Sequence, residues 1–247
     1  MRRVRNLIVD IGNTRTKVAV TEEGKVLCEE AREDFAPAAL CGLAAEWCVA
    51  RAIVSSTRGD GSAVVETLRG AGVETLHFTP GVAVPLRSDY LTPETLGCDR
   101  LAAAVGADLL FPGRTVLIVD FGTAVTLDVV SGGCFRGGFI SPGLRTRFRA
   151  LHDYTAALPE EAPAAEWLPI GRTTAECIQQ GVEQGLAYEI EGQIARLREK
   201  FGELSVIFTG GDAKRFAKRI KNTIFADCDP VIAGLNRILE YHVHRKK

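Results

Sequence analysis

The stretch that decides the fold is LIVDIGNTRTKVAV, residues 7–20. A second stretch, LIVDFGTAVTLDVV at residues 117–130, matches it at an offset of 110 with no gap. In each stretch an apolar strand runs into Asp-x-Gly, and a second strand follows a turn of glycine and small polar residues. The match therefore predicts a duplicated unit with a carboxylate at a strand end in each copy, Asp10 and Asp120.

The sequence continues in parallel after each copy. A third strand is expected at 25–29 or 134–140, followed by a helix at 37–49 or 173–200. A strand, a polar loop, a second helix and a short strand then occupy 51–78 or 204–226. The order β-β-β-α-β-α-β, found twice, predicts an α/β protein with two similar actin-like (ribonuclease H-like) lobes and an interlobe cleft.

The boundary between the lobes is expected after the helix at 101–110, where Phe111-Pro112-Gly113 breaks the helical pattern. We expect an N-terminal lobe over residues 1–112 and a C-terminal lobe over residues 113–247. Ligands bind beyond the carboxyl ends of strands in sheets of this kind, so the site is expected in the cleft between the lobes.

The composition narrows the class of protein. The 247 residues are 46% hydrophobic and carry a formal net charge of -1, which disfavours a nucleic-acid partner. The apolar run at 7–9 stops at Asp10, so no signal peptide is predicted, and no run is long enough to span a bilayer. Seven cysteines without Cys-x-x-Cys spacing predict free thiols rather than disulfides or a zinc site. We expect a cytoplasmic protein.

The first turn has the residues of a phosphate-binding loop. Gly12 lets the backbone approach a phosphate, and Lys17 offers a point charge. Asp10 can hold hydrated magnesium. The predicted nucleotide-binding loop is Asp10, Ile11, Gly12, Asn13, Thr14, Arg15, Thr16 and Lys17. The alternative is a hairpin turn with a solvated Asp and Lys.

The second turn repeats the carboxylate but not the lysine, whose position in the gap-free match is Leu127. Thr123 can donate a hydrogen bond to a phosphate, and Asp120 can bind a cation. The alternative is a structural Asp that caps the turn.

A third group of polar residues lies before the helix at 101–110. Tyr90 precedes Gly97, Cys98, Asp99 and Arg100, which place a carboxylate and a guanidinium at a helix N-terminus. Asp99 is either a helix cap or a general base for a substrate hydroxyl, and Arg100 suits a substrate carboxylate. The four histidines show no metal-ligand spacing.

In this order and spacing the motifs resemble those of the type III pantothenate kinases. Residues 10–17 resemble the family's ATP loop, and Tyr90 with 97–100 resembles its pantothenate-binding and catalytic motif. Residues 120–123 resemble the segment that holds a monovalent cation and ATP. Three further segments match as well: Gly137–Gly143, Gly171–Thr174 and Thr209–Gly211. Phe121 and Thr173 depart from the family's usual residues, a small one and Asn.

The resemblance implies ATP-dependent phosphorylation of pantothenate to 4'-phosphopantothenate, the first committed step towards coenzyme A. It also implies Mg²⁺ with ATP, K⁺ or NH₄⁺ at Asp120, a nucleotide contact from Thr123, and a homodimer. Asp99 would be catalytic. The substrate-binding residues would be Tyr90, Gly97, Cys98, Asp99, Arg100 and Thr174. The alternatives are another small-metabolite kinase of the actin superfamily and a non-catalytic regulatory homologue.

Overall fold

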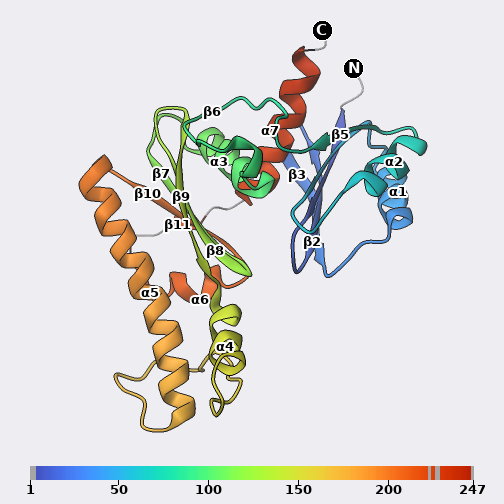
Figure 1. Ribbon diagram of the computed structural model, residues 1–247. Helices are drawn as coiled ribbons and strands as arrows, with labels where there is room; N and C mark the ends of the chain where they lie inside the picture. The colour runs from blue at the N-terminus through green and yellow to red at the C-terminus, as the bar shows by residue number, and fades with distance from the viewer. Residues whose placement is uncertain (1–3, 222–223, 226–228, 246–247) are drawn as a thin grey trace. The chain divides into compact units, whose positions relative to one another are not determined.

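The computed structural model describes residues 4–221, 224–225 and 229–245, and its contacts divide the chain into two units (Figure 1). Unit 1 comprises Met1–Gly113, Gly132–Gly137 and Cys228–Lys247, and unit 2 comprises Arg114–Ser131 and Gly138–Asp227. The first segment of unit 1 ends one residue from the lobe boundary expected at 112. The sequence predicted one boundary, with all later residues in the second lobe. The contacts instead assign Gly132–Gly137 and Cys228–Lys247 to unit 1.

Unit 1 begins with the predicted order of elements. In chain order they are β1 (Arg5–Ile11), β2 (Thr16–Glu22), β3 (Lys25–Arg32), α1 (Pro37–Glu46), β4 (Arg51–Ser56), α2 (Ser62–Gly70) and β5 (Glu74–Phe78). The five strands form one sheet in the order β3-β2-β1-β4-β5, with β1 antiparallel to β2 and parallel to β4. After a 3₁₀ turn at Pro93–Thr95 the unit continues into α3 (Cys98–Leu110) and later α7 (Pro230–Arg245).

The sheet of unit 1 is covered by helices on both faces. One face packs with α1 and α2 around a core that includes Val9, Val18 and Val54. The residues that alternate with these face α3 and α7, and Asn6 donates a hydrogen bond to Asn236 of α7 at 2.9 Å. The two helices touch through Gly106 and Gly234. A Cβ on either glycine would lie within 2.0 Å of a backbone oxygen of the other helix.

Unit 2 repeats the topology. Its elements are β7 (Val116–Phe121), β8 (Ala124–Val130), β9 (Cys134–Pro142), α4 (Leu144–Asp153), α5 (Thr174–Phe201), β10 (Ser205–Gly210), α6 (Ala213–Ala217) and β11 (Ile224–Phe225). Their strand order is β9-β8-β7-β10-β11, equivalent to that of unit 1. In unit 1, the two-residue strand β6 (Arg87–Ser88) pairs with Cys134 and Phe135, the first two residues of β9. The predicted α/β class with two similar lobes is confirmed.

The strand register corrects the gap-free match of the two copies. In unit 1 Asp10 lies opposite Lys17, whereas in unit 2 Asp120 lies opposite Thr126. The β7–β8 turn is one residue shorter, and a shift of one residue moves a side chain to the other face of a strand. Leu127 is therefore fully buried in the core of unit 2 and is not the counterpart of Lys17, which is Thr126.

Two helices were absent from the prediction, α4 and α7. The helix predicted at 213–221 is shorter, since α6 ends at Ala217, and residues 223 and 226 of the last predicted strand lie outside the described residues. Phe121 fits because unit 2 encloses it. Its ring is 1% exposed and stacks on Phe216 at 5.0 Å. In the part of the chain that the structure describes, no helix has the length and apolarity to cross a membrane.

Candidate active site

The first Asp-x-Gly turn is a tight connection between β1 and β2. The Gly12 N–H donates to the Arg15 carbonyl at 3.0 Å, and a Cβ on Gly12 would lie 2.9 Å from that oxygen. Glycine is needed here because of this close approach. Asn13, Thr14 and Arg15 are exposed at the tip, as a loop that contacts a ligand requires.

Asp10 lies in a row of polar residues across three strands. Lys17 is its register partner on β2 and Ser55 is its partner on β4. Ser55 is fully buried, and its Oγ has no hydrogen-bond partner among the described residues. A carboxylate beside a buried hydroxyl fits hydrated Mg²⁺, which keeps its waters and takes few protein carboxylates. The residues present therefore suit the metal that accompanies ATP.

Lys17 has a carboxylate partner from the far end of the chain. Its ammonium forms an ion pair with Asp229, the residue before α7, and the two side chains are 28% and 11% exposed. Glu29 on β3 is close to both. Burial raises the pKa of Glu29, Asp229 raises it further, and Lys17 lowers it.

The N-terminus of α3 holds the predicted catalytic group. Asp99 lies in the first helical turn and accepts the Arg100 N–H at 2.8 Å. A Cβ on Gly97 would lie 2.5 Å from the Asp99 carboxylate, so glycine leaves room for that group. Burial, followed by the charges of Asp99 and Asp10, raises the pKa of the Cys98 thiol to about 11. Asp10 and Asp99, 89 residues apart in the sequence, are thus both close to one side chain.

Arg100 lies against two aromatic rings that also contact each other. Its guanidinium lies 5.7 Å from the centroid of Tyr90 and 5.9 Å from that of Phe135, and the rings are 5.8 Å apart. Arg100 is only 7% exposed. The structure therefore joins Tyr90 and Arg100 as the sequence predicted and adds Phe135, which the motifs did not indicate. Arg136 follows Phe135 and pairs with Asp89 at 2.6 Å, which fixes the segment next to Tyr90.

A cavity of about 200 Å³ lies on the opposite face of the same sheet. Ile11, Thr16, Phe35 and Arg58 are among its lining residues. Asp10, Lys17 and Ser55 alternate with the residues that face this cavity. Asp10, Lys17 and Ser55 therefore face the α3/α7 side of the sheet and not the cavity.

The second Asp-x-Gly turn is enclosed by glycines of unit 2. A Cβ on Gly210 would lie 2.3 Å from the Asp120 carboxylate and 2.7 Å from the Phe121 carbonyl oxygen. Gly143 donates its N–H to the Thr123 carbonyl at 3.0 Å, and a Cβ there would lie 2.1 Å from the Gly122 carbonyl oxygen. A carboxylate with backbone carbonyls around it is an all-oxygen set, which fits a hard monovalent cation. The glycines of segments 137–143 and 209–211 thus leave the space that this set occupies.

Thr174 begins α5, and the preceding turn is packed against that helix. Thr173 and Glu176 form a capping box, and a Cβ on Gly171 would lie 2.5 Å from the Cys177 nitrogen. Thr173, noted above as a departure from Asn, serves as the helix cap. Thr174 belongs to unit 2, whereas Tyr90, Asp99 and Arg100 belong to unit 1.

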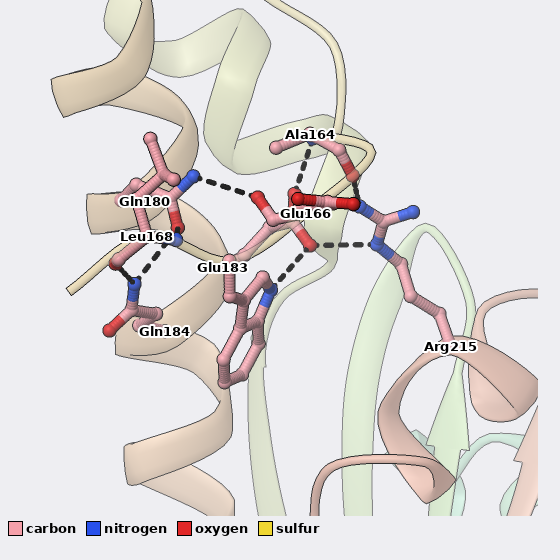
Figure 2. A network of polar contacts seen from close by, with 8 residues as sticks. Ala164, Glu166, Leu168, Gln180, Glu183, Gln184 and Arg215 are labelled. Atoms are coloured by element: carbon pink, nitrogen blue, oxygen red, sulfur yellow. Dashed lines mark hydrogen bonds and ion pairs between the residues drawn. The ribbon is translucent and has the colours of Figure 1, made fainter. Parts of the chain in front are cut away.

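A buried polar network holds the segment before Thr174 (Figure 2). Glu183 of α5 is fully buried and accepts two hydrogen bonds from Arg215 of α6, at 2.7 and 2.8 Å. It also accepts the N–H of Ala164 at 2.6 Å and of Trp167 at 3.1 Å. Gln180 accepts the N–H of Leu168 at 2.9 Å, and Gln184 donates to the Leu168 carbonyl at 2.7 Å. The irregular stretch is thereby fixed to α5 and α6, and α6 follows the glycine loop at 209–211.

Solved structures share this arrangement of elements. A putative 2-dehydro-3-deoxygalactonokinase from Sinorhizobium meliloti has a TM-score of 0.60 at 15% identity, over 96% of this chain and 99% of its own. A conserved putative Baf family transcriptional activator from Campylobacter jejuni has a TM-score of 0.63 at 18% identity, over 96% and 99%. These similarities concern the fold. They show an α/β fold of two lobes with equivalent strand orders, and in this chain each lobe carries a carboxylate turn.

Sequence comparison then gives the family. The family model for type III pantothenate kinase matches residues 6–196. The type III pantothenate kinase of Phocaeicola vulgatus is 39% identical over 241 residues, which is 96% of this chain and 98% of that protein. The one from Porphyromonas gingivalis is 41% identical over 242 residues, at 96% and 99% coverage. The chain belongs to the type III pantothenate kinase family.

Proposed function

We propose that this protein transfers the γ-phosphoryl group of ATP to the hydroxyl of pantothenate, giving 4'-phosphopantothenate for coenzyme A synthesis. The observation that carries the proposal is the placement of Asp99. Its carboxylate lies at the start of α3, and both Asp99 and Asp10 act on the Cys98 thiol. A general base is thus close to the carboxylate that suits magnesium, within one unit. Phosphoryl transfer requires the base and the metal-binding carboxylate to be close together, because the attacking hydroxyl must lie next to the transferring phosphate.

Arg100 and Tyr90 are proposed to bind the pantothenate carboxylate. An Arg guanidinium matches a carboxylate in shape and charge, and the rings of Tyr90 and Phe135 limit its orientation. Gly97 and Cys98 would shape the wall next to Asp99. Asp99 would accept the proton of the hydroxyl as the phosphoryl group is transferred. Thr174 is proposed as a further substrate contact, on the family resemblance.

The loop at 10–17 is proposed to hold the ATP phosphates. Its exposed tip supplies donors, Lys17 supplies charge, and Asp10 would hold the Mg²⁺ ion through its waters. When bound, Mg²⁺ offsets the charge of the phosphate oxygens. In unit 2 we propose that Asp120 holds K⁺ or NH₄⁺ and that Thr123 contacts phosphate.

A coupled assay of ADP release tests the function. We expect release of ADP from MgATP only when pantothenate is present, and faster release with potassium than with sodium. Pantothenate analogues without the terminal hydroxyl should give no ADP. An ADP release that does not respond to pantothenate would reject the assignment.

A homodimer is also proposed. Unit 2 exposes Ile140 at 62%, Phe139 at 41% and Tyr188 at 61%, and apolar side chains of this size favour a protein partner. Light scattering on the eluting protein should give a mass near twice the 26.7 kDa of the chain. A mass equal to one chain at assay concentration would argue against the dimer.

A further inference from the structure

We infer that Asp229 is a positioning residue for phosphoryl transfer, because it holds the Lys17 ammonium where the transferring phosphate needs it. The inference rests on the proposed role of the loop at 10–17. Asp229 lies outside the motifs that point to the nucleotide and the substrate, 212 residues after Lys17.

The Asp229 carboxylate is fixed from two sides. One oxygen, Oδ1, accepts the Val231 N–H at 2.9 Å. The other, Oδ2, accepts from Lys17. The Asp229 carbonyl accepts the Ala233 N–H at 3.0 Å, so the residue caps the start of α7. Because α7 packs on β1, β4 and α3, the position of the Asp229 carboxylate is fixed by the packing of α7 and α3 on the sheet.

Lysine needs such an anchor more than arginine does. Its ammonium is a point charge at the end of a flexible four-carbon stem, and ordering that stem costs conformational entropy. An ammonium that is already in place stabilises the developing charge without reorganisation. Asp229 approaches Lys17 from the helix layer and Glu29 approaches from β3. The Lys17 ammonium is therefore restrained by Asp229 while its side chain remains 28% exposed.

Neutralising Asp229 should affect ATP affinity and turnover differently. Its carboxylate repels bound phosphates, so Asp229→Asn should leave the affinity for ATP unchanged or tighter. Lys17 would no longer be oriented by Asp229, so turnover should fall by about 10- to 100-fold. This is the usual cost of a misplaced group. General damage to the loop would instead weaken binding and turnover together.

The experiment compares Asp229→Asn with Asp60→Asn. Asp60 also lies just before a helix and accepts the Ser62 N–H at 2.9 Å, but among its described contacts it has no lysine. For each variant kcat and KM are measured for ATP and for pantothenate, and calorimetry measures binding of MgADP and of a non-reacting ATP analogue. We expect the turnover loss only in Asp229→Asn, with nucleotide binding retained and KM for pantothenate unchanged. Unchanged or faster turnover in that variant, or weakened nucleotide binding, would overturn the inference.

A second background separates positioning from structure. Lys17→Ala removes the group that Asp229 is inferred to hold, so Asp229→Asn should cause no further loss there. A full additional loss would show that Asp229 acts through α7 alone and would overturn the inference. If Asp229→Asn does not fold, Asp229→Ser keeps a helix-capping hydroxyl and is measured in its place. Wild-type protein that releases no ADP with pantothenate would reject the proposed function instead.

Discussion

The sequence left two roles open for Asp99, helix cap and general base. It lies in the first turn of α3, where a carboxylate is favoured by the helix dipole, and it accepts the Arg100 N–H. A side chain that is held in this way by the backbone has a fixed direction. Gly97 and not Asp99 occupies the N-cap position of α3, and a carboxylate with a fixed direction suits the proposed general base.

Replacing Asp99 by Asn should separate these roles. The amide keeps the size of the side chain and removes its basicity, so kcat should fall by about 10²–10⁴-fold. Calorimetry with an ATP analogue should show unchanged nucleotide binding. Asp108→Asn, near the other end of α3, is the matched control. Near wild-type turnover in Asp99→Asn would remove Asp99 from the catalytic role.

Glu29 gives a test of stability against pH. Its pKa is raised by burial first and by Asp229 second, so the folded state binds this proton more tightly than the unfolded state. The stabilising contribution is complete below the ordinary pKa of 4.5 and is lost as the pH rises through the folded-state value. Glu29→Gln should therefore raise Tm at neutral pH, by about 2–4 °C for each kcal/mol recovered.

The gain from Glu29→Gln should disappear below pH 4.5, where the native carboxyl is also neutral. Calorimetric scans of Glu29→Gln and of the control Glu33→Gln, four residues further along the chain, measure this. An equal gain at both pH values would mean that the charge is not its cause.

At the scale of elements, the sequence predicted those whose signals are local. Strand β5 has the predicted bounds 74–78 and α2 the predicted bounds 62–70, because turn residues flank each of them. The N-terminus of α7 also has a local signal that was not used. Asp229-Pro230 places a capping carboxylate before a proline in the first turn, which is typical of a helix start. This signal predicts the start of α7, and the capping residue that it identifies, Asp229, is the partner of Lys17.

Glu183 should dominate the stability of the irregular segment between α4 and α5, which it fixes to α5 and α6. Burial alone would raise its pKa, but hydrogen bonds from Arg215, Trp167 and Ala164 outweigh burial and lower it. The carboxylate thus contributes stability above pH 4.5 that is lost as the pH falls through the folded-state value. Removing one partner of a buried pair costs about 3–5 kcal/mol. Glu183→Gln should accordingly lower Tm by roughly 10 °C in a chain of this size.

Glu189→Gln is the control in the same helix. Glu189 pairs with Arg147 at 2.5 Å, but the two side chains are 31% and 21% exposed, so the expected loss is below about 1 kcal/mol. Equal shifts of Tm in the two variants would show that burial does not set the contribution of Glu183.

At the scale of the whole molecule, the sequence predicted the duplication of the lobe. It did not predict which residues of the two lobes are equivalent. The repeated strand pattern was sufficient for two lobes of one topology, and the sheets have equivalent strand orders. The gap-free match failed at the β7–β8 turn, because turn length is set by backbone geometry that a short match does not record. The return of residues 228–247 to unit 1 depends on contacts between α7 and α3, more than 100 residues apart in the chain.

The two equivalent turns differ in charge, and this difference leads to the last prediction. Asp10 lies opposite Lys17, whereas Asp120 lies opposite Thr126, which has no charge. A carboxylate near bound polyphosphate needs its charge offset, and a potassium or ammonium ion at Asp120 would do so. The carbonyl oxygens of Phe121 and Gly122 belong to the same turn and are suitable further ligands. Sodium is a smaller ion and would fit poorly in a set of ligands spaced for potassium.

Activity should therefore require potassium or ammonium, and Asp120→Ala should lose that response. Its turnover at saturating potassium should fall by about 10²-fold, the usual cost of removing one charge-stabilising group. Protein stripped of potassium is assayed against a series of potassium, ammonium and sodium chloride at constant ionic strength. Asp153→Ala, an exposed carboxylate of the same unit, should keep the parent's response. Full activity in sodium alone, or an unchanged potassium response in Asp120→Ala, would refute the ion site, because then neither the ion nor its carboxylate would contribute to the transition state.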